Sequence, residues 1–326
     1  MSLLSVKNLS TSFHMHSGVV RAVSNVSFDV DQGEITGIVG ESGCGKTALC
    51  LSLLRLIPQP PGKIEATGIF FKGNNLLTCS HEEIRRIRGN RISMIFQDPL
   101  SSLNPYLKVF NQLIEPLQVH RGLSKKQCLP LAQAALDEVG LGNSATKLSA
   151  YPHEFSGGMR QRIMIAMGLI TQPDILIADE PTTALDVTVQ AQILTLIRSL
   201  LRKHGMSVIF ITHNLGIVAH LCNRVLVMYA GRIVEDAPVR DLFYHTRHPY
   251  TQALIKSLPS AQAPDEKLKA IAGLPPDLSR PIIGCSFADR CEFVKDYCRN
   301  TPIELKEVEK RHASACMRII NGDLLS

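Results

Sequence analysis

Four short apolar runs limit what this chain can fold into more than any other feature. They span residues 34–39, 91–96, 174–178 and 207–212, and they are rich in β-branched side chains. The runs show little alternation with polar residues, which is typical of strands buried on both faces of a parallel sheet. We therefore predict an α/β fold with a mostly parallel core sheet.

Each run leads into residues that can bind phosphate or a metal ion. The first run precedes the glycine-rich residues 40–47 and the second precedes Gln97, while Asp179 and Glu180 follow the third and His213 follows the fourth. Ligands of open α/β sheets bind beyond the carboxyl ends of the strands. We therefore expect these four strand ends to converge on one site.

Residues 40–47 match the phosphate-binding loop of nucleotide hydrolases in full. The loop consists of Gly40, Glu41, Ser42, Gly43, Cys44, Gly45, Lys46 and Thr47. Its glycines let backbone N–H groups surround phosphates, and a helix predicted over residues 47–56 adds the positive end of its dipole. We expect Lys46 to bind the β- and γ-phosphates of ATP and Thr47 to bind Mg²⁺. The alternative, a glycine-rich turn without function, is disfavoured by the strand before the loop and the helix after it.

Cys44 within this loop has two interpretations. It is either a small neutral residue that fills space, or a thiol that bound Mg-ATP would shield from alkylation.

Two adjacent acids and one serine-glycine motif complete the chemistry that the residues themselves suggest. Asp179 is expected to hold Mg²⁺, and Glu180 to orient or deprotonate the attacking water. Ser156, Gly157 and Gly158 precede a helix predicted over residues 160–170 and form a second anion-binding helix start. The alternatives are that the acids cap the next helix and that Ser156 only caps its own.

The remaining pattern indicates an inserted helical region and a loop-rich end. Residues 99–155 read as helical, with an amphipathic helix over 125–139 that Ser124 caps and Pro130 could kink. A second long helix is predicted over residues 184–203. Beyond residue 236 prolines recur, including Pro259 and Pro264, so we predict a linker and a small C-terminal domain.

Composition excludes some classes of protein. The net charge of +6 is mild, aromatic residues make up 5% of the chain, and Trp is absent, which argues against a base-stacking platform for nucleic acid. We expect no signal peptide, and no apolar stretch is long enough to cross a bilayer. A role at a membrane would therefore require partner subunits and the cytoplasmic side.

Four cysteines gather near the C-terminus at Cys285, Cys291, Cys298 and Cys316. No Cys-x-x-Cys pair occurs among them, so the usual zinc hairpin is not supported. Spacing alone leaves an iron–sulfur cluster, zinc and free thiols open. Arg290, Lys295 and Arg299 are expected to offset the negative charge of a cluster.

The order of these motifs resembles that of ATP-binding-cassette ATPases over about residues 3–235. This resemblance implies a P-loop NTPase fold with an antiparallel β subdomain and a helical subdomain at about residues 99–165. It also implies that two cassettes pack head to tail, so that Ser156, Gly157 and Gly158 of one complete the ATP site of the other. Phe155 and Met159 depart from the commonest signature, and Asn214 follows His213 where Asp is frequent.

The resemblance implies specific roles for four further residues. Gln97 is similar to the glutamine that contacts Mg²⁺ and senses the membrane subunits, and His213 to the histidine that contacts the γ-phosphate. Asp186, in the sequence Ala184-Leu185-Asp186, is similar to the acid that communicates across the dimer. Phe13 is the candidate for stacking on adenine.

Residues 248–254 and 284–291 resemble the C-terminal extension of dipeptide and oligopeptide importer ATPases. Within the cassette, residues 96–105 and 155–162 are similar to the same subgroup. The implied organisation is a cassette over residues 1–235 and an extension over residues 236–326, with a [4Fe–4S] cluster on the four cysteines and zinc as the alternative. The implied function is ATP hydrolysis that powers peptide uptake, from a peripheral position on the cytoplasmic face of the cell (inner) membrane. The expected partners are two permeases, a second cassette and an extracytoplasmic solute-binding protein, with no nucleic acid.

Three alternatives to peptide import stay open. The first is an importer of nickel or another small solute, the second a soluble cassette that acts on nucleic acid, and the third a non-hydrolysing regulatory cassette. The last is disfavoured because Lys46, Asp179, Glu180 and His213 are all present.

Overall fold

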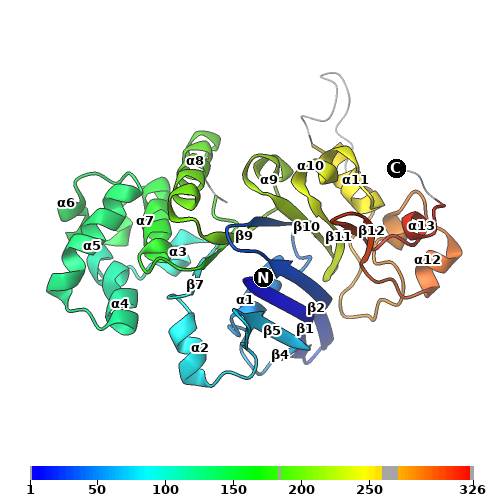
Figure 1. Cartoon of the computed structure of the whole chain (residues 1–326), viewed down its shortest axis with the longest axis horizontal. Helices are drawn as coiled ribbons and strands as arrows, with labels where there is room; N and C mark the ends of the chain where they lie inside the picture. The colour runs from blue at the N-terminus through cyan, green and yellow to red at the C-terminus, as the bar shows by residue number, and fades with distance from the viewer. Residues whose placement is uncertain (1, 183–184, 259–270, 324–326) are drawn as a thin grey trace. The chain divides into compact units, whose positions relative to one another are not determined.

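The computed structural model describes residues 2–182, 185–258 and 271–323 (Figure 1). The chain forms two compact units. The first unit contains residues 1–77 and 212–326, and the second contains residues 78–211. Ala184, Pro259 and Pro264, which the sequence placed in a helix and a linker, lie outside the described residues.

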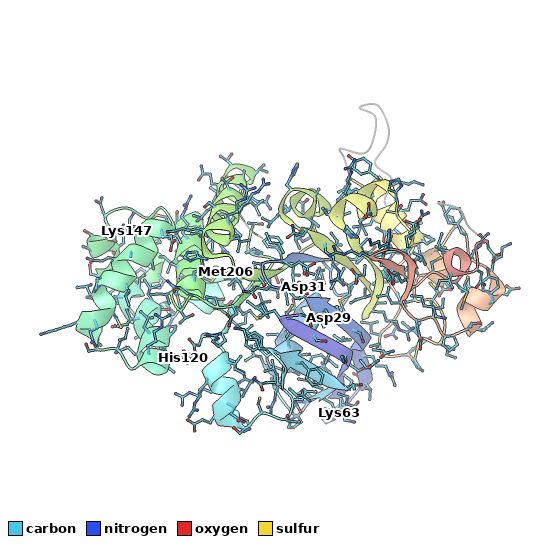
Figure 2. The ribbon with its side chains drawn as sticks, viewed as in Figure 1. Asp29, Asp31, Lys63, His120, Lys147 and Met206 are labelled. Carbon is cyan, nitrogen blue, oxygen red and sulfur yellow. The ribbon has the colours of Figure 1, made fainter. Side chains whose placement is uncertain are left out.

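An antiparallel sheet occupies the N-terminal part of the first unit. Its strands run in the order β2-β1-β5-β6, and β4 also pairs with β1. Their bounds are β1 (Leu4–Met15), β2 (Gly18–Val30), β4 (Gly62–Glu65), β5 (Gly68–Phe71) and β6 (Asn74–Asn75). Lys63, labelled in Figure 2, lies on the edge strand β4. It forms an exposed ion pair with Glu65, and charge on an edge strand discourages pairing with other chains. This sheet is the antiparallel β subdomain that the resemblance implied.

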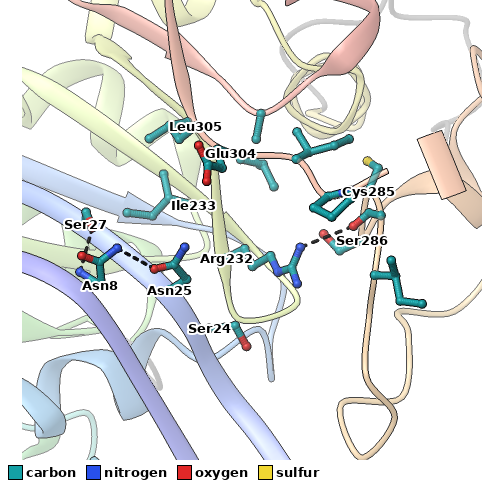
Figure 3. A pocket seen from close by; sticks show the side chains of 16 residues that line it. Asn8, Ser24, Asn25, Ser27, Arg232, Ile233, Cys285, Ser286, Glu304 and Leu305 are labelled. Atoms are coloured by element: carbon teal, nitrogen blue, oxygen red, sulfur yellow. Dashed lines mark hydrogen bonds between the residues drawn. The ribbon is translucent and has the colours of Figure 1, made fainter. Parts of the chain in front are cut away.

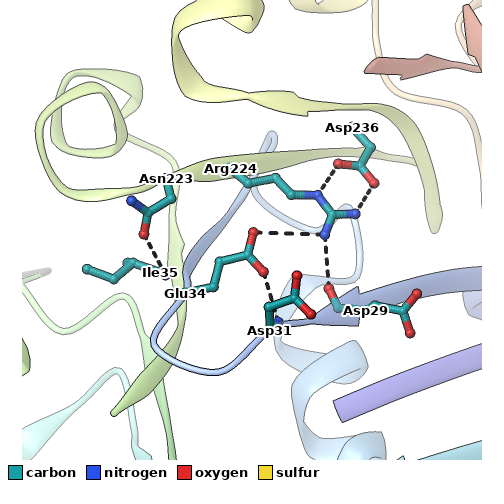
Figure 4. Close-up of polar contacts among 7 residues, drawn as sticks. All are labelled: Asp29, Asp31, Glu34, Ile35, Asn223, Arg224 and Asp236. Carbon is teal, nitrogen blue, oxygen red and sulfur yellow. Dashed lines mark hydrogen bonds and ion pairs between the residues drawn. The ribbon is translucent and has the colours of Figure 1, made fainter. Parts of the chain in front are cut away.

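A second sheet of the first unit contains the strand that leads into the phosphate loop. Strand β3 (Ile35–Val39) runs parallel to β10 (Arg224–Tyr229), and β10 pairs antiparallel with β11 (Arg232–Pro238). Arg224 of β10 links this sheet to the antiparallel one, since its guanidinium binds the carboxylate of Asp236 on β11 and the carbonyl of Asp29 on β2 (Figure 4). The same unit includes the helices α1 (Lys46–Leu53), α9 (Leu215–Leu221), α10 (Val239–Tyr244) and α11 (Pro249–Lys256).

The C-terminal residues extend this second sheet. Strand β13 (His312–Ser314) pairs antiparallel with both β11 and β12 (Lys306–Glu309). Three short helical segments surround them, η3 (Ala288–Arg290), α12 (Asp296–Asn300) and α13 (Met317–Ile320). The sequence predicted a separate loop-rich domain, whereas these residues also add two strands to the sheet that carries the phosphate loop. The predicted boundary at residue 235 stays a prediction, and β11 runs across it.

Three parallel strands form the sheet of the second unit. Strand β8 (Ile175–Asp179) lies between β7 (Ile92–Ile95) and β9 (Ser207–Thr212). Every residue of β8 and β9 is buried, as expected for strands covered on both faces. Together with β3 these are the four predicted strands, so the parallel α/β prediction is confirmed.

The helices of the second unit include α2 (His81–Ile87), α3 (Pro99–Ser102), α4 (Val109–Arg121), α5 (Lys125–Glu138), α6 (Ser144–Ser149), α7 (Gly157–Leu169) and α8 (Val187–His204). Side chains cap α2, α5, α7 and α8 among them. Helix α5 is continuous through Pro130, because its buried face of Cys128, Ala132 and Leu136 holds it in place. Ser156 caps α7, which therefore starts three residues earlier than predicted.

Within the part of the chain that is described, no helix combines the length and the apolar character needed to cross a bilayer.

Candidate functional site

The phosphate loop joins β3 to α1 in the first unit, and backbone packing requires two of its glycines, Gly40 and Gly45. A Cβ atom on Gly45 would lie 2.1 Å from the carbonyl oxygen of Ala22, and the φ angle of Gly45 is 104°. A Cβ atom on Gly40 would lie 2.1 Å from the carbonyl oxygen of Met228. No other residue fits at either position without moving the neighbouring backbone.

Lys46 lies at the start of α1 and is 5% exposed. Its ammonium donates hydrogen bonds to the carbonyl oxygens of Gly40 at 2.8 Å and Glu41 at 3.0 Å. The loop therefore holds a buried cation next to a helix N-terminus, an arrangement suited to binding phosphate.

Cys44 is buried within the loop, with 5% of its surface exposed. Burial raises the pKa of its thiol because the thiolate is poorly solvated there. The thiol is therefore protonated at neutral pH, which favours the interpretation of Cys44 as a small neutral residue.

The acidic strand end lies in the second unit, where Gln97 and Glu180 meet. The amide nitrogen of Gln97 donates to the carboxylate of Glu180 at 3.2 Å. The backbone of Glu180 has a φ angle of 46°, and its N–H donates to the carbonyl of Ile211 at 3.0 Å. Non-glycine residues in this conformation are strained, and such strain is common at functional sites. Asp179 precedes Glu180 at the end of β8 and is 2% exposed.

Two of the predicted site residues, Asp186 and Ser156, cap helices, whereas Asp179 and Glu180 do not. Asp186 caps α8 by accepting a hydrogen bond from the N–H of Val189 at 2.8 Å. The next helix therefore does not use Asp179 or Glu180 as its cap, which removes the alternative interpretation of that pair. Ser156 accepts a hydrogen bond from the N–H of Met159 at 3.4 Å, so its capping role is present whatever else it binds.

Two further residues with a predicted role at the nucleotide, His213 and Phe13, belong to the first unit. His213 is exposed and follows β9, and Asn214 beside it caps α9 by accepting hydrogen bonds from two backbone N–H groups. Capping is a local reason for Asn at that position. Phe13 lies half-buried on β1, opposite Val20 and Gly62, and its contact with adenine stays a prediction.

The residues predicted to hold Mg²⁺ supply oxygen donors, as that ion requires. They are the Thr47 hydroxyl, the Gln97 amide and the Asp179 carboxylate. Among the described residues, no group of three or more His, Cys, Asp or Glu side chains could hold a metal ion. Mg²⁺ is usually bound by one or two side chains together with phosphate oxygens and water, so this donor set fits an ion that arrives with the nucleotide.

The four C-terminal cysteines lie around one small pocket of about 20 Å³, which His248 and Phe287 also line. All four are free thiols, and burial raises the pKa of Cys285 to about 12. Like the other described residues, these cysteines form no group of three or more side chains that could hold a metal ion. The structure thus gathers the thiols without arranging them around a metal, and it does not support the expected iron–sulfur cluster.

Two of the three charges expected to offset that cluster, Arg290 and Arg299, make other contacts. Arg290 binds the Glu41 carboxylate of the phosphate loop at 2.9 Å, and Arg299 binds Asp289. The N–H of Glu41 also donates to the Tyr250 hydroxyl at 3.0 Å. Sequence reasoning missed these partners of the loop, although both Tyr250 and Arg290 lie in the segments that resemble peptide importers.

A larger pocket of about 520 Å³ lies beside β11 in the first unit (Figure 3). Arg232 lines it and donates to the carbonyl oxygens of Ile282 and Gly284. Cys285 also lines this pocket, but none of the predicted ATP-binding residues does.

Comparison with known proteins agrees with this arrangement. The family model described as "ABC transporter" matches residues 23–183, and that described as "Oligopeptide/dipeptide transporter, C-terminal region" matches residues 234–298. The "Probable peptide ABC transporter ATP-binding protein y4tR" of Sinorhizobium fredii is 50% identical over 317 residues, which cover 97% of this chain and 95% of that protein. The dipeptide transport ATP-binding protein DppD of Bacillus subtilis is 51% identical over 289 residues, covering 89% and 86%.

The solved structures include a similar cassette. A dimeric post-hydrolysis state of the ATP-binding cassette MJ0796, bound to ADP and phosphate, matches with a TM-score of 0.65 at 26% identity. The match covers 73% of this chain and 99% of that cassette. The chain therefore belongs to the ATP-binding-cassette (ABC) transporter ATPases, in the subgroup that carries the oligopeptide/dipeptide transporter C-terminal region.

Proposed function

We propose that this chain is the ATP-hydrolysing subunit of an importer that moves dipeptides or oligopeptides across the cytoplasmic membrane. The observation that carries the proposal is the match of nearly the whole chain to relatives named for peptide transport, with 97% of it covered at 50% identity. The preformed phosphate loop, with its buried Lys46, supports the ATPase part of the proposal.

In the proposed mechanism, each of the predicted residues has a separate role at the nucleotide. Lys46 binds the β- and γ-phosphates, and Thr47, Gln97 and Asp179 hold Mg²⁺, which neutralises developing charge on the phosphates when bound. Glu180 accepts a proton from, or orients, the attacking water, and its hydrogen bond from Gln97 fixes the carboxylate for that task.

His213 contacts the γ-phosphate in this proposal, and Phe13 stacks on the adenine. The order of the motifs supports both assignments. The side chains also suit these ligands, because a His ring N–H can donate to phosphate and the face of a Phe ring can stack on a base.

We propose further that two cassettes act as a head-to-tail pair. Ser156, Gly157 and Gly158 at the start of α7 would meet the ATP held by the partner's phosphate loop, and Asp186 would communicate between the two sites. The dimeric form of the solved relative supports a pair of cassettes. The second cassette is either a copy of this chain or a related one.

The proposed assembly places this chain on the cytoplasmic face of the membrane, as a peripheral subunit. Two permeases would form the path through the bilayer, and an extracytoplasmic binding protein would deliver the peptide. Hydrolysis would then drive the permeases between two states.

Reconstitution of the chain with its permeases and binding protein in vesicles tests this function. ATP-dependent accumulation of a labelled dipeptide or oligopeptide is the expected result, with Lys46→Ala as the inactive control. Accumulation of nickel without peptide uptake would replace the proposal with the small-solute alternative, and ATP hydrolysis stimulated only by nucleic acid would refute both.

A [4Fe–4S] cluster on the four C-terminal cysteines is a second proposal. Its support is that all four thiols line one pocket, and binding of a metal group commonly organises its own ligands. Anaerobic purification should give a brown protein with broad visible absorbance and matching iron and sulfide contents. Colourless protein with stoichiometric zinc would favour zinc, and metal-free protein would leave free thiols.

A further inference from the structure

The C-terminal extension contacts the phosphate loop through one buried arginine. The side chain of Arg290 is 6% exposed, and its Nη1 donates to the Glu41 carboxylate at 2.9 Å and to the Tyr229 hydroxyl at 3.2 Å. Arg290 and Glu41 are 249 residues apart in sequence but belong to the same unit. Burying an ion pair costs free energy, because both charges lose hydration, so this pair is weak evidence for stability and suggests another role.

Arg290 is held firmly by contacts other than the one to Glu41. Its Nε donates to the carbonyl of Ala272 at 2.9 Å, and its Nη2 donates to that of Ile271 at 3.2 Å. The guanidinium also lies 5.7 Å from the centre of the Tyr229 ring and 5.9 Å from that of Phe287. The charge of Arg290 is therefore fixed in position before any contact with the loop is considered.

Glu41 is held through its N–H, its carbonyl and its side chain. The N–H donates to the Tyr250 hydroxyl at 3.0 Å, and the carbonyl accepts from the Lys46 ammonium at 3.0 Å. Its carboxylate is bound by Arg290. The extension therefore fixes the residue whose backbone holds the phosphate-binding lysine.

Without Arg290, the Glu41 carboxylate would disfavour the binding of phosphate to this loop. It belongs to a loop that binds a polyanion, and a carboxylate close to phosphates repels them. Arg290 supplies the positive charge that compensates it, and Glu41 is partly buried, so solvent screens the carboxylate less than at an open surface.

We propose that Arg290 is a positioning residue for ATP binding, which neutralises Glu41 and holds the phosphate loop in its binding conformation. This inference rests on the proposed role of residues 40–47 in binding ATP. In this proposal the C-terminal extension is part of the nucleotide site. Its contact with Glu41 raises the affinity for ATP and does not take part in hydrolysis.

The test compares ATP affinity and turnover in the purified full-length protein. Arg290→Met should weaken the binding of Mg-ATP about tenfold, in the usual range of a coupling between two sites, and should raise KM while kcat changes little. Arg290→Lys should recover part of the affinity, because the charge returns without the forked geometry. Arg299→Gln is the matched control, since Arg299 lies in the same segment and binds Asp289 instead of the loop.

A double variant separates charge compensation from simple loss of structure. If Arg290 acts by neutralising Glu41, the variant Arg290→Met with Glu41→Gln should bind ATP more tightly than Arg290→Met alone. Unchanged affinity in Arg290→Met, or no recovery in the double variant when both proteins melt at the same temperature, would overturn the inference. If Arg290→Met does not fold, Arg290→Gln, which also removes the charge but keeps a polar side chain, replaces it in both comparisons.

The outcome for the proposed function is distinct. Wild-type protein that binds no ATP, or that binds it equally well with Lys46→Ala, would refute the ATP site itself. Wild-type binding that depends on Lys46 but not on Arg290 would refute only the role of Arg290.

Discussion

The phosphate loop and the four-cysteine pocket lie in the same unit but are organised in different ways. The loop is held by its backbone: glycines allow close packing, and carbonyl oxygens fix the Lys46 ammonium. The pocket gathers four side chains from separate segments and does not arrange them around a metal. A loop that binds and releases a substrate in each cycle must keep its shape alone, whereas a permanent metal group can organise its own ligands.

Loss of the proposed catalytic base should have the largest effect, because it acts on the chemical step. Glu180→Gln is expected to lower ATP turnover about 10³-fold while leaving ATP binding intact. Phosphate release measures turnover, and size-exclusion chromatography with ATP should show a trapped dimer. Glu82→Gln is the control, since Glu82 forms an exposed pair with Arg86. Turnover at the wild-type rate in Glu180→Gln would remove this role.

A single methyl group in the loop tests whether its shape is fixed by packing. In Gly45→Ala the new Cβ would lie 2.1 Å from the Ala22 carbonyl oxygen, so the loop must move and ATP affinity should fall by about 10²-fold or more. Equilibrium binding of Mg-ATP measures the loss.

Gly73→Ala separates this clash from backbone strain alone. Gly73 also has a positive φ, of 83°, but its Cβ would meet nothing within 4 Å. It should cost only about 1 kcal/mol of stability and leave ATP affinity unchanged. Equal ATP affinities for the two variants would contradict the packing argument.

Substitution in the cysteine pocket should change the metal content of the protein more than its binding of ATP. Cys291→Ser is expected to remove most of any bound iron or zinc and to lower the melting temperature by several degrees. Elemental analysis and thermal unfolding measure the two effects. Cys128→Ser, at a buried cysteine within α5, is the control that changes a thiol without changing metal content. Wild-type protein without metal would mean that the pocket contains only thiols.

The smallest effect concerns Cys44, where the structure predicts slow reaction. Because burial raises the pKa of this thiol, the reactive thiolate is a minor form, and alkylation should accelerate about tenfold per pH unit between pH 7 and 9. Mass spectrometry of labelled peptides follows the reaction, and saturating Mg-ATP should slow it further. Labelling that is fast at pH 7 and insensitive to nucleotide would contradict the buried, loop-enclosed position of Cys44.

Local sequence patterns predicted the core strands and the phosphate loop. The features that these patterns did not predict depend on contacts between residues far apart in sequence. The four strands and the continuous motif of residues 40–47 depend on periodicity and adjacency, so the sequence was sufficient. Helix α8 was predicted to start at residue 184, but Asp186 caps it and the helix begins at Val187. The contact between Arg290 and Glu41 joins residues 249 apart, and no local pattern could reveal it.

The pairing of β13 with β11 has a consequence for how the protein is made. Glu235 and Asp236 of β11 lie opposite Ser314 and Ala313, which come much later in the sequence. A ribosome therefore completes the phosphate loop and the whole of β11 long before the strand that covers the edge of β11 exists. An uncovered edge is a template for aggregation. We expect nascent chains that stop near residue 300 to need chaperone protection that the finished chain does not.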